Sequence, residues 1–141
     1  MDIKALKSSN LKGKVSIPGD KSISHRSIIL SSIAEGISEI SGFLTGEDCL
    51  ATLNAFKKMG IKIDQHDRHI RVHGLGLNGL TKPGEDLDLG NSGTSMRLLA
   101  GLLSGQNFSS NLKGDSSLSS RPMNRIIKPL NKMGALISLE G

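Results

Sequence analysis

Residues 18–26 read Pro-Gly-Asp-Lys-Ser-Ile-Ser-His-Arg, and this stretch of nine residues is the clearest indication of the fold class. It follows residues 13–18, where the pattern predicts a short strand that a Pro-Gly pair closes. It opens a helical pattern over residues 22–35, which stops at Gly36. A helix that begins directly after a strand turns its first free N–H groups toward one point. The stretch therefore predicts an α/β unit whose turn is suited to an anion.

After residue 36, the sequence predicts strands and helices in an order that starts again at residue 86. The first pass is predicted as a strand at 37–43, a helix at 47–59 that ends at Gly60, paired strands at 61–63 and 70–72 around a polar turn at 65–68, and a loop at 74–85. The second pass is predicted as a strand at 86–89, a turn at 90–93, a helix at 94–103, a strand at 108–112, a turn at 114–115, a helix at 119–132 and a strand at 135–139. Pro122 is tolerable in the first turn of that last helix, whereas Pro129 is expected to kink or shorten its last turn.

The second pass is an internal repeat of the first. Gly19 corresponds to Gly90 and Arg26 to Arg97, both at a spacing of 71 residues. This period exceeds that of ordinary solenoid repeats and favours duplicated βαβαββ units, an α/β fold with helices packed on sheets. The second unit breaks off before its closing strands, so we expect the sequence to be a piece of a longer chain.

The composition narrows the classes of partner. Hydrophobic residues make up 36% of the 141 residues, which allows a packed core, and one cysteine excludes an internal disulfide and a Cys-rich zinc site. A net charge of +5 indicates an anionic partner. With three Phe, no Tyr and no Trp, the chain lacks the aromatic residues on which single-stranded nucleic acid stacks, so we expect no nucleic-acid partner. No apolar run approaches the ~20 residues of a membrane span and no signal peptide is evident, so we expect no membrane partner and a cytoplasmic location.

Three polar turns are the candidate anion sites. In the first, Lys21, Ser22 and Arg26 can converge on a phosphate or carboxylate, with Ser22 or Ser24 as the helix cap. A capped helix with solvated charges explains this stretch equally well. The second turn, at residues 90–97, reads Gly-Asn-Ser-Gly-Thr-Ser-Met-Arg.

The second turn offers Ser92 or Thr94 as the cap, and Arg97 repeats the place of Arg26. A flexible turn with an incidental arginine is the alternative.

The third turn, at residues 114–123, reads Gly-Asp-Ser-Ser-Leu-Ser-Ser-Arg-Pro-Met and places Arg121 at a helix entrance, where it could also be simply solvated.

Other reactive side chains have ordinary structural explanations. His25 is expected to be a surface or capping residue rather than a base, and Cys49 a buried, inert thiol. Glu47 and Asp48 are expected to be first-turn acids that favour the helix dipole. The remaining histidines cluster around the predicted hairpin, where their spacing does not suit a metal, so no metal site is predicted.

Together the three turns resemble the N-terminal signatures of the 5-enolpyruvylshikimate-3-phosphate (EPSP) synthases, also called 3-phosphoshikimate 1-carboxyvinyltransferases. The motifs stand in the family's order and spacing, and the resemblance runs over the whole chain. It implies the enolpyruvyl transferase fold, with two similar domains that each contain three βαβαββ units on mixed sheets. It also implies transfer of the enolpyruvyl group of phosphoenolpyruvate to the 5-hydroxyl of shikimate 3-phosphate. The implied reaction releases phosphate and needs no metal or organic cofactor. It belongs to the shikimate pathway, which leads to chorismate and the aromatic amino acids.

The resemblance also implies roles for particular residues. Lys21 would contact both substrates and act in catalysis, and Ser22 and Arg26 would hold shikimate 3-phosphate. The phosphoenolpyruvate site, for which the herbicide glyphosate would compete, would be lined by Lys21, Asn91, Gly93, Thr94 and Arg121. The family's acid and base residues lie mainly in the second domain, so we expect no turnover by this chain alone.

The same resemblance implies a division of the chain. Residues 1–14 would be a crossover segment that pairs with a second domain outside this sequence. Residues 15–141 would be part of the N-terminal domain, with unit one at about 15–74 and unit two at about 86–141. The full-length enzyme is expected to be a monomer, whereas the open strand edges of an unfinished unit would favour self-association.

Two alternatives to this function stay open. The sister enolpyruvyl transferase that acts on UDP-N-acetylglucosamine shares the fold, but it uses a Lys-Asn pair where this chain has Lys21 and Ser22. The second alternative is a non-catalytic anion-binding fragment, which belongs to a different class of protein.

Overall fold

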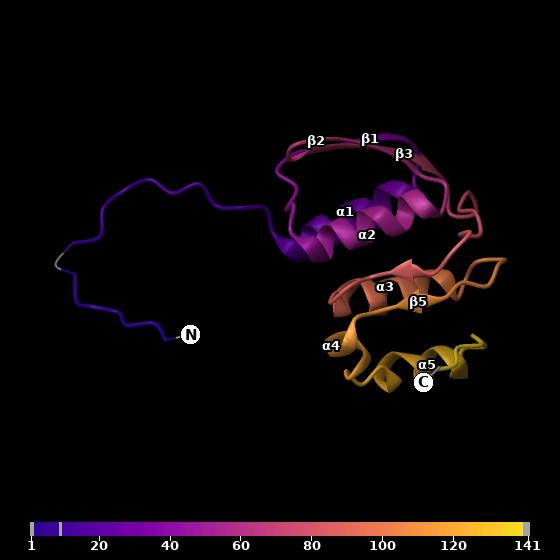
Figure 1. Ribbon diagram of the computed structural model, residues 1–141. Coiled ribbons are helices and arrows are strands. Elements are labelled where there is room, and N and C mark those ends of the chain that lie inside the picture. Colours follow the sequence, from indigo (N-terminus) through magenta and orange to yellow (C-terminus); the bar gives the residue numbers. More distant parts are fainter. Residues whose placement is uncertain (1, 9, 140–141) are drawn as a thin grey trace.

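The computed structural model describes residues 2–8 and 10–139 (Figure 1). The described residues before Gly19 form an extended arm without helix or strand, and the arm points away from the folded body. The arm meets the body at Gly19, where a Cβ would lie 2.0 Å from the carbonyl oxygen of Gly42. Only glycine permits this approach of two backbones. The first helix begins two residues after this contact.

The first half of the body is an antiparallel sheet on two helices. Its elements are α1 (Lys21–Ile33), β1 (Glu35–Ile40), α2 (Glu47–Lys58), β2 (Lys62–His66) and β3 (His69–Leu75). The strand order β1-β3-β2 makes β3 the central strand. Along β3, Ile70 and Val72 are buried while His69 and Arg71 are exposed, so the sheet turns one apolar face inward.

The core lies between this sheet and the helices. α1 and α2 lie side by side beneath the sheet, and α1 packs against both α2 and β3 (Figure 1). Each large apolar side chain buried there stabilises the fold by roughly 1.5–3 kcal/mol. The largest fully buried side chains in this layer include Ile28, Phe43, Leu53, Phe56, Met59, Ile70 and Val72.

The second half of the body continues this core. Its elements are β4 (Leu87–Asp88), α3 (Gly93–Leu103), β5 (Leu112–Lys113), α4 (Ser116–Ser119) and α5 (Asn124–Lys132). β4 and β5 pair in parallel, with α3 as the crossover helix between them. α3 also contacts α1, α2 and α5, so it joins the two halves. The fully buried Leu87, Leu89, Leu99 and Leu118 belong to the same core cluster.

Two predicted strands are wrong. Residues 13–18 lie in the extended arm, and residues 135–139 follow α5 without forming a strand. In the part of the chain that the structure describes, neither segment pairs with a neighbouring strand, so its backbone groups gain no ladder hydrogen bonds. The strand predicted at 108–112 is limited to Leu112–Lys113.

The single helix predicted at 119–132 is two helices. α4 ends at Ser119 and α5 begins at Asn124. Arg121 precedes Pro122, and the residue before a proline disfavours the helical conformation, so the chain leaves the helix there. α5 runs past Pro129 to Lys132, and this proline does not shorten the helix.

The apolar segments of the described chain are all short. No described helix combines the length and the apolar character that crossing a bilayer requires.

Candidate functional site

The first turns of α1, α2 and α3 meet at one end of the helix layer, beside the polar turns. The Lys21 ammonium of α1 pairs with the Asp48 carboxylate of α2. The Ser95 hydroxyl of α3 lies 3.5 Å from the backbone carbonyl oxygen of Asp48. Three helices therefore direct the positive ends of their dipoles toward one region, which favours anions.

The cap of α1 is Asp20. Its carboxylate accepts a hydrogen bond from the backbone N–H of Ile23 at 2.7 Å. The prediction that Ser22 or Ser24 caps this helix is therefore wrong. The Ser24 hydroxyl instead donates to the Asp20 carbonyl oxygen at 2.8 Å and accepts from the backbone N–H of Leu44 at 3.0 Å. A carboxylate caps a helix at least as well as a hydroxyl and also interacts favourably with the dipole.

Three predicted site residues lie exposed on the first two turns of α1. They are Lys21, Ser22 and Arg26. Among the described residues, Ser22 and Arg26 have no side-chain hydrogen bond or ion pair, whereas Lys21 is held by Asp48. Sequence reasoning missed this role of Asp48, although its place in the first turn of α2 was the available signal.

The cap of α3 is Ser92, one of the two candidates. Its hydroxyl accepts a hydrogen bond from the backbone N–H of Ser95 at 3.2 Å. Gly90 enters the turn with a φ of 53°, the left-handed region that favours glycine. Thr94, the other candidate, is exposed on the first turn of the helix.

Arg121 is half-buried and is hydrogen-bonded at the start of α3. Its Nη2 donates to Oδ1 of Asn91 at 2.5 Å, and Nδ2 of Asn91 donates to the Asp115 carboxylate at 3.0 Å. The hydrogen bond from Asn91, followed by the backbone N–H of Leu118, lowers the pKa of Asp115, so this carboxyl stays ionised. Asp115 is also the cap of α4 and thus fixes both Asn91 and the approach to Arg121. Asp115 is a further residue that sequence reasoning missed.

Gly93 lies between two guanidinium groups. A Cβ at this position would lie 2.7 Å from Nη1 of Arg97 and 3.0 Å from Nη1 of Arg121. Arg97 donates to the Gly93 carbonyl oxygen at 3.1 Å. Neither arginine forms an ion pair with a carboxylate of the described residues. Two guanidinium groups without acidic partners beside a glycine suit a carboxylate or phosphate ligand.

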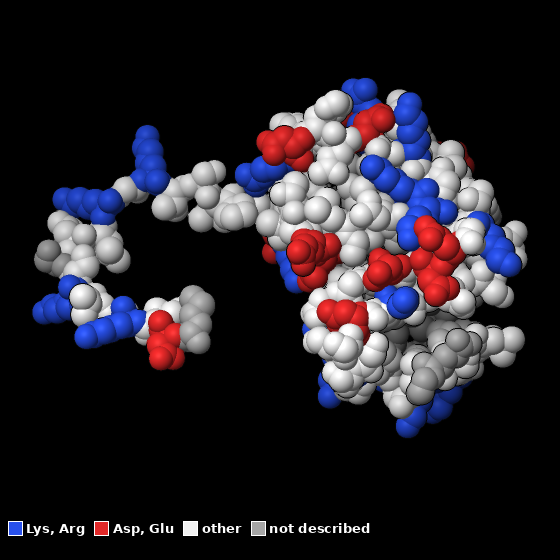
Figure 2. Space-filling view, viewed as in Figure 1, with Lys and Arg blue, Asp and Glu red and all other residues white. Residues whose placement is uncertain are grey.

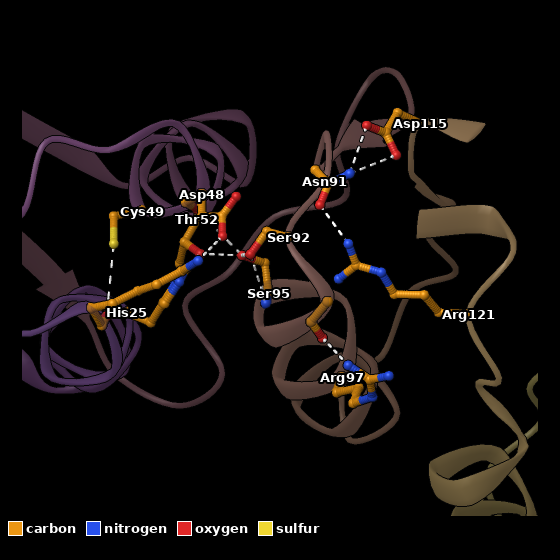
Figure 3. A network of polar contacts seen from close by, with 12 residues as sticks. His25, Asp48, Cys49, Thr52, Asn91, Ser92, Ser95, Arg97, Asp115 and Arg121 are labelled. Carbon is orange, nitrogen blue, oxygen red and sulfur yellow. Dashed lines mark hydrogen bonds and ion pairs between the residues drawn. The ribbon is translucent and has the colours of Figure 1, made fainter. Parts of the chain in front are cut away.

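His25 is fully buried, so its predicted place at the surface is wrong. α1 is enclosed by α2, α3 and β3, which leaves no exposed side at this position. Nδ1 of His25 lies 2.7 Å from the Thr52 hydroxyl, which lies 2.6 Å from the Ser95 hydroxyl. The Ser95 hydroxyl lies 2.6 Å from that of Ser92, and Figure 3 shows the row of contacts from α1 to α3.

Burial of His25 makes the stability of the fold depend on pH. Burial lowers the pKa of His25 from its ordinary 6.5, with the Asp48 charge opposing and the Lys21 charge reinforcing this shift. Below pH 6.5 the unfolded chain takes up a proton that the folded chain does not bind. The free energy of unfolding is therefore expected to fall as the pH drops from 6.5 toward the lower folded pKa. Urea unfolding of wild type and His25→Asn at pH 7.5 and 5.5 measures this loss.

The matched control for this prediction is His66→Gln. His66 is exposed on β2, so its replacement should leave the pH dependence of unfolding as it is in wild type. His25→Asn should flatten that dependence. Equal pH dependence in wild type and His25→Asn would contradict the prediction.

Cys49 is a buried thiol, as predicted. It is fully buried in α2, and burial raises its pKa, so the reactive thiolate is disfavoured. In the part of the chain that the structure describes, no three His, Cys, Asp or Glu side chains are grouped so that they could hold a metal ion.

The charges of the body are mixed on the face that Figure 2 shows. Acidic and basic side chains are mixed on that face, and basic side chains also project from the extended arm.

Comparison with known proteins places the chain in a family. The family model of EPSP synthase (3-phosphoshikimate 1-carboxyvinyltransferase) matches residues 6–141. The chain is 59% identical over 128 residues to a 3-phosphoshikimate 1-carboxyvinyltransferase of Ruthia magnifica and 58% identical over 129 residues to that of Pelobacter propionicus. These matches cover 91% and 92% of the chain but only 29% and 30% of the relatives.

Comparison with solved structures indicates the same family. The structure matches an EPSP synthase from Acinetobacter baumannii with a TM-score of 0.87 and 55% identity, over 92% of this chain and 30% of that one. The chain therefore belongs to the EPSP synthase family, and the predicted α/β class with helices on mixed sheets is confirmed. It spans about 30% of the length of the relatives that it matches.

Proposed function

We propose that these residues form part of the active site of an EPSP synthase. The reaction transfers the enolpyruvyl group of phosphoenolpyruvate to shikimate 3-phosphate, in the shikimate pathway. A bond forms between the 5-oxygen of shikimate 3-phosphate and C2 of phosphoenolpyruvate, and the bond from C2 to the phosphate oxygen breaks. The hydroxyl proton leaves with the phosphate. Membership of the family and the anion-binding geometry of the three turns support this proposal.

The observation that carries the proposal is the pair of guanidinium groups beside Gly93. Arg97 and Arg121 flank the start of α3 without an ion pair to a carboxylate of the described residues, and Asn91 holds Arg121 in place. Both substrates are anions, and preorganised cations and N–H groups stabilise charge that develops in the reaction. We assign the phosphoenolpyruvate side of the site to Asn91, Gly93, Thr94 and Arg121, with glyphosate as a competitor there.

The shikimate 3-phosphate side is assigned to α1. Ser22 and Arg26 are exposed and unpaired among the described side chains, so both can contact a phosphate. Lys21 is assigned to both substrates as a catalytic residue, because an ammonium has three donors and Asp48 need occupy only one. Its place between α1 and α2 puts it beside the region where the helix ends meet.

The organisation expected from the sequence is proposed with this function. Unit one is assigned to about 15–74 and unit two to about 86–141, joined by the segment between β3 and β4. Residues 1–14 are assigned to pairing with polypeptide outside this sequence. We further propose a monomeric full-length enzyme in the cytoplasm, where phosphorylated metabolites are available, and self-association of this chain through its open strand edges.

Calorimetric titration of the chain with shikimate 3-phosphate at low salt tests the function. Because the chain spans about 30% of its relatives, the test measures binding rather than turnover. We expect shikimate 3-phosphate to bind at least about tenfold more tightly than inorganic phosphate, since each charge-assisted hydrogen bond adds roughly 1.5–3 kcal/mol. Arg26→Gln should remove most of this preference.

The control variant is Arg125→Gln, which removes an exposed arginine of α5 outside the assigned site. Its affinity for shikimate 3-phosphate should equal that of wild type. Equal affinity of wild type for the two ligands would contradict the assigned substrate and favour a non-catalytic anion-binding fragment.

A further inference from the structure

We propose that Thr52 and His25 are positioning residues, which hold the start of α3 in register with the start of α1. They act through the buried row of hydrogen bonds that runs through His25, Thr52, Ser95 and Ser92. The proposal rests on the proposed function only for the identity of the anions bound at the two helix ends.

The row joins three helices inside the core. His25 belongs to α1, Thr52 to α2, and Ser95 and Ser92 to the start of α3 (Figure 3). All four side chains are fully buried. A buried polar group that loses its partner pays a desolvation penalty, so each bond in the row constrains the next. The relative placement of the three helices is therefore fixed by polar contacts as well as by apolar packing.

Each end of the row lies beside a proposed binding residue. Ser92 is flanked by Asn91, which holds Arg121, and by Gly93, which the two guanidinium groups approach. His25 precedes Arg26 in α1 and lies one turn after Lys21. A shift of the row would therefore move both anion sites relative to each other.

The number of hydroxyl protons decides which group donates in each hydrogen bond of the row. Each hydroxyl has one proton to donate, and the Ser92 hydroxyl already accepts from the Ser95 N–H. If Ser92 donates to Ser95, Ser95 to Thr52 and Thr52 to Nδ1 of His25, every hydroxyl proton has an acceptor. If Nδ1 of His25 donates to Thr52 instead, two arrangements remain. Either the Ser92 proton has no acceptor in the row, or the Ser95 proton must reach the Asp48 carbonyl oxygen at 3.5 Å. We therefore assign Nδ1 as an acceptor and the proton to Nε2, which has no protein partner among the described residues.

A pair of substitutions at Thr52 separates the hydroxyl from the shape of the side chain. Thr52→Val keeps the branched shape and removes the hydroxyl, whereas Thr52→Ser keeps the hydroxyl. The matched control is Ser32→Ala, which removes a fully buried hydroxyl of α1 that bonds only to its own helix, at the Ile28 carbonyl oxygen (2.7 Å). The readouts are the ¹⁵N shifts of the His25 ring and the amide signals of the 141-residue chain.

We expect Thr52→Val to move the Nδ1 shift of His25 and the amide signals of Asn91, Gly93 and Ser95. Amide exchange at Ser95 should become about tenfold faster, because an opened hydrogen bond lowers local protection. Thr52→Ser should restore the wild-type signals, and Ser32→Ala should not affect them. Unchanged signals at the start of α3 in Thr52→Val, or equal changes in Ser32→Ala, would overturn the proposal.

A second variant keeps the test decisive if Thr52→Val does not fold. Ser95→Ala breaks the row in α3, and we expect it to move the Nδ1 shift of His25 in α1. A wild-type spectrum with a protonated Nδ1 would overturn the assigned direction, and an unaffected His25 ring in Ser95→Ala would overturn the row as a positioning device. None of these measurements uses a ligand, so a failed titration with shikimate 3-phosphate would reject the proposed function alone.

Discussion

Gly93→Ala is expected to weaken binding of phosphoenolpyruvate to the chain by roughly tenfold to a hundredfold, the loss of one charge-assisted hydrogen bond of roughly 1.5–3 kcal/mol. The added Cβ would lie 2.7 Å from Nη1 of Arg97 and 3.0 Å from Nη1 of Arg121, so both guanidinium groups must move. Arg121 cannot move freely, because its 2.5 Å hydrogen bond to Asn91 ties it to the same turn. Calorimetric titration with phosphoenolpyruvate, in the presence of shikimate 3-phosphate, measures the loss.

The control is Gly101→Ala, on the same helix. Nothing lies within 4 Å of a Cβ at Gly101, so this substitution adds a methyl group without crowding a guanidinium. In a full-length enzyme with these residues, Gly93→Ala is also expected to weaken inhibition by glyphosate. Equal phosphoenolpyruvate affinities in the two variants, or an unchanged glyphosate inhibition constant, would contradict the assigned role of Gly93.

Gly74→Ala is expected to lower the free energy of unfolding by about 3 kcal/mol or more. Gly74 lies in β3, where a Cβ would come within 2.2 Å of the Ser31 carbonyl oxygen and 2.3 Å of that of Ala34. Overpacking costs typically about 1–3 kcal/mol, and here the crowded atoms are backbone rather than a flexible side chain. The Ala34 carbonyl is further held by the N–H of Gly76 at 2.9 Å. Such a loss is a large fraction of the 5–15 kcal/mol that stabilises a typical domain.

Urea denaturation followed by circular dichroism measures this change. The matched control is Gly84→Ala, in the loop before β4, where a Cβ meets nothing within 4 Å. Gly84→Ala should unfold at the same urea concentration as wild type. A Gly74→Ala chain that unfolds together with this control would show that the end of α1 can withdraw from the sheet.

Local signals were enough to predict α1, α2, α3 and the hairpin, but not the break between α4 and α5. Gly60 ends α2 with a φ of 90°, and the helix that follows the Gly90 turn begins at Gly93, one residue before the predicted start. Strands were predicted less well, because a strand requires a partner that the local pattern does not reveal. Residues 13–18 have a strand pattern, yet they remain in the arm since no described strand lies beside them.

The site was predicted as a set of residues but not as a set of contacts. The sequence placed Lys21 and Arg121 at helix entrances, while their partners Asp48 and Asn91 come from other elements that only the fold brings close. His25 shows the same limit. Its burial depends on α2 and α3 packing around α1, and a single helix carries no signal of how many sides its neighbours will cover.

The caps of the two repeated helices differ by one negative charge. Asp20 places a carboxylate at the start of α1, whereas the neutral hydroxyl of Ser92 caps α3. The Asp20 carboxylate thus partly neutralises the positive end of the α1 dipole, whereas the positive end of the α3 dipole has no charged cap. An anion bound at the start of α1 therefore lies beside a fixed carboxylate, whereas an anion at the start of α3 meets a neutral cap. One capping residue can therefore change the affinity of a helix end for anions without a change of backbone.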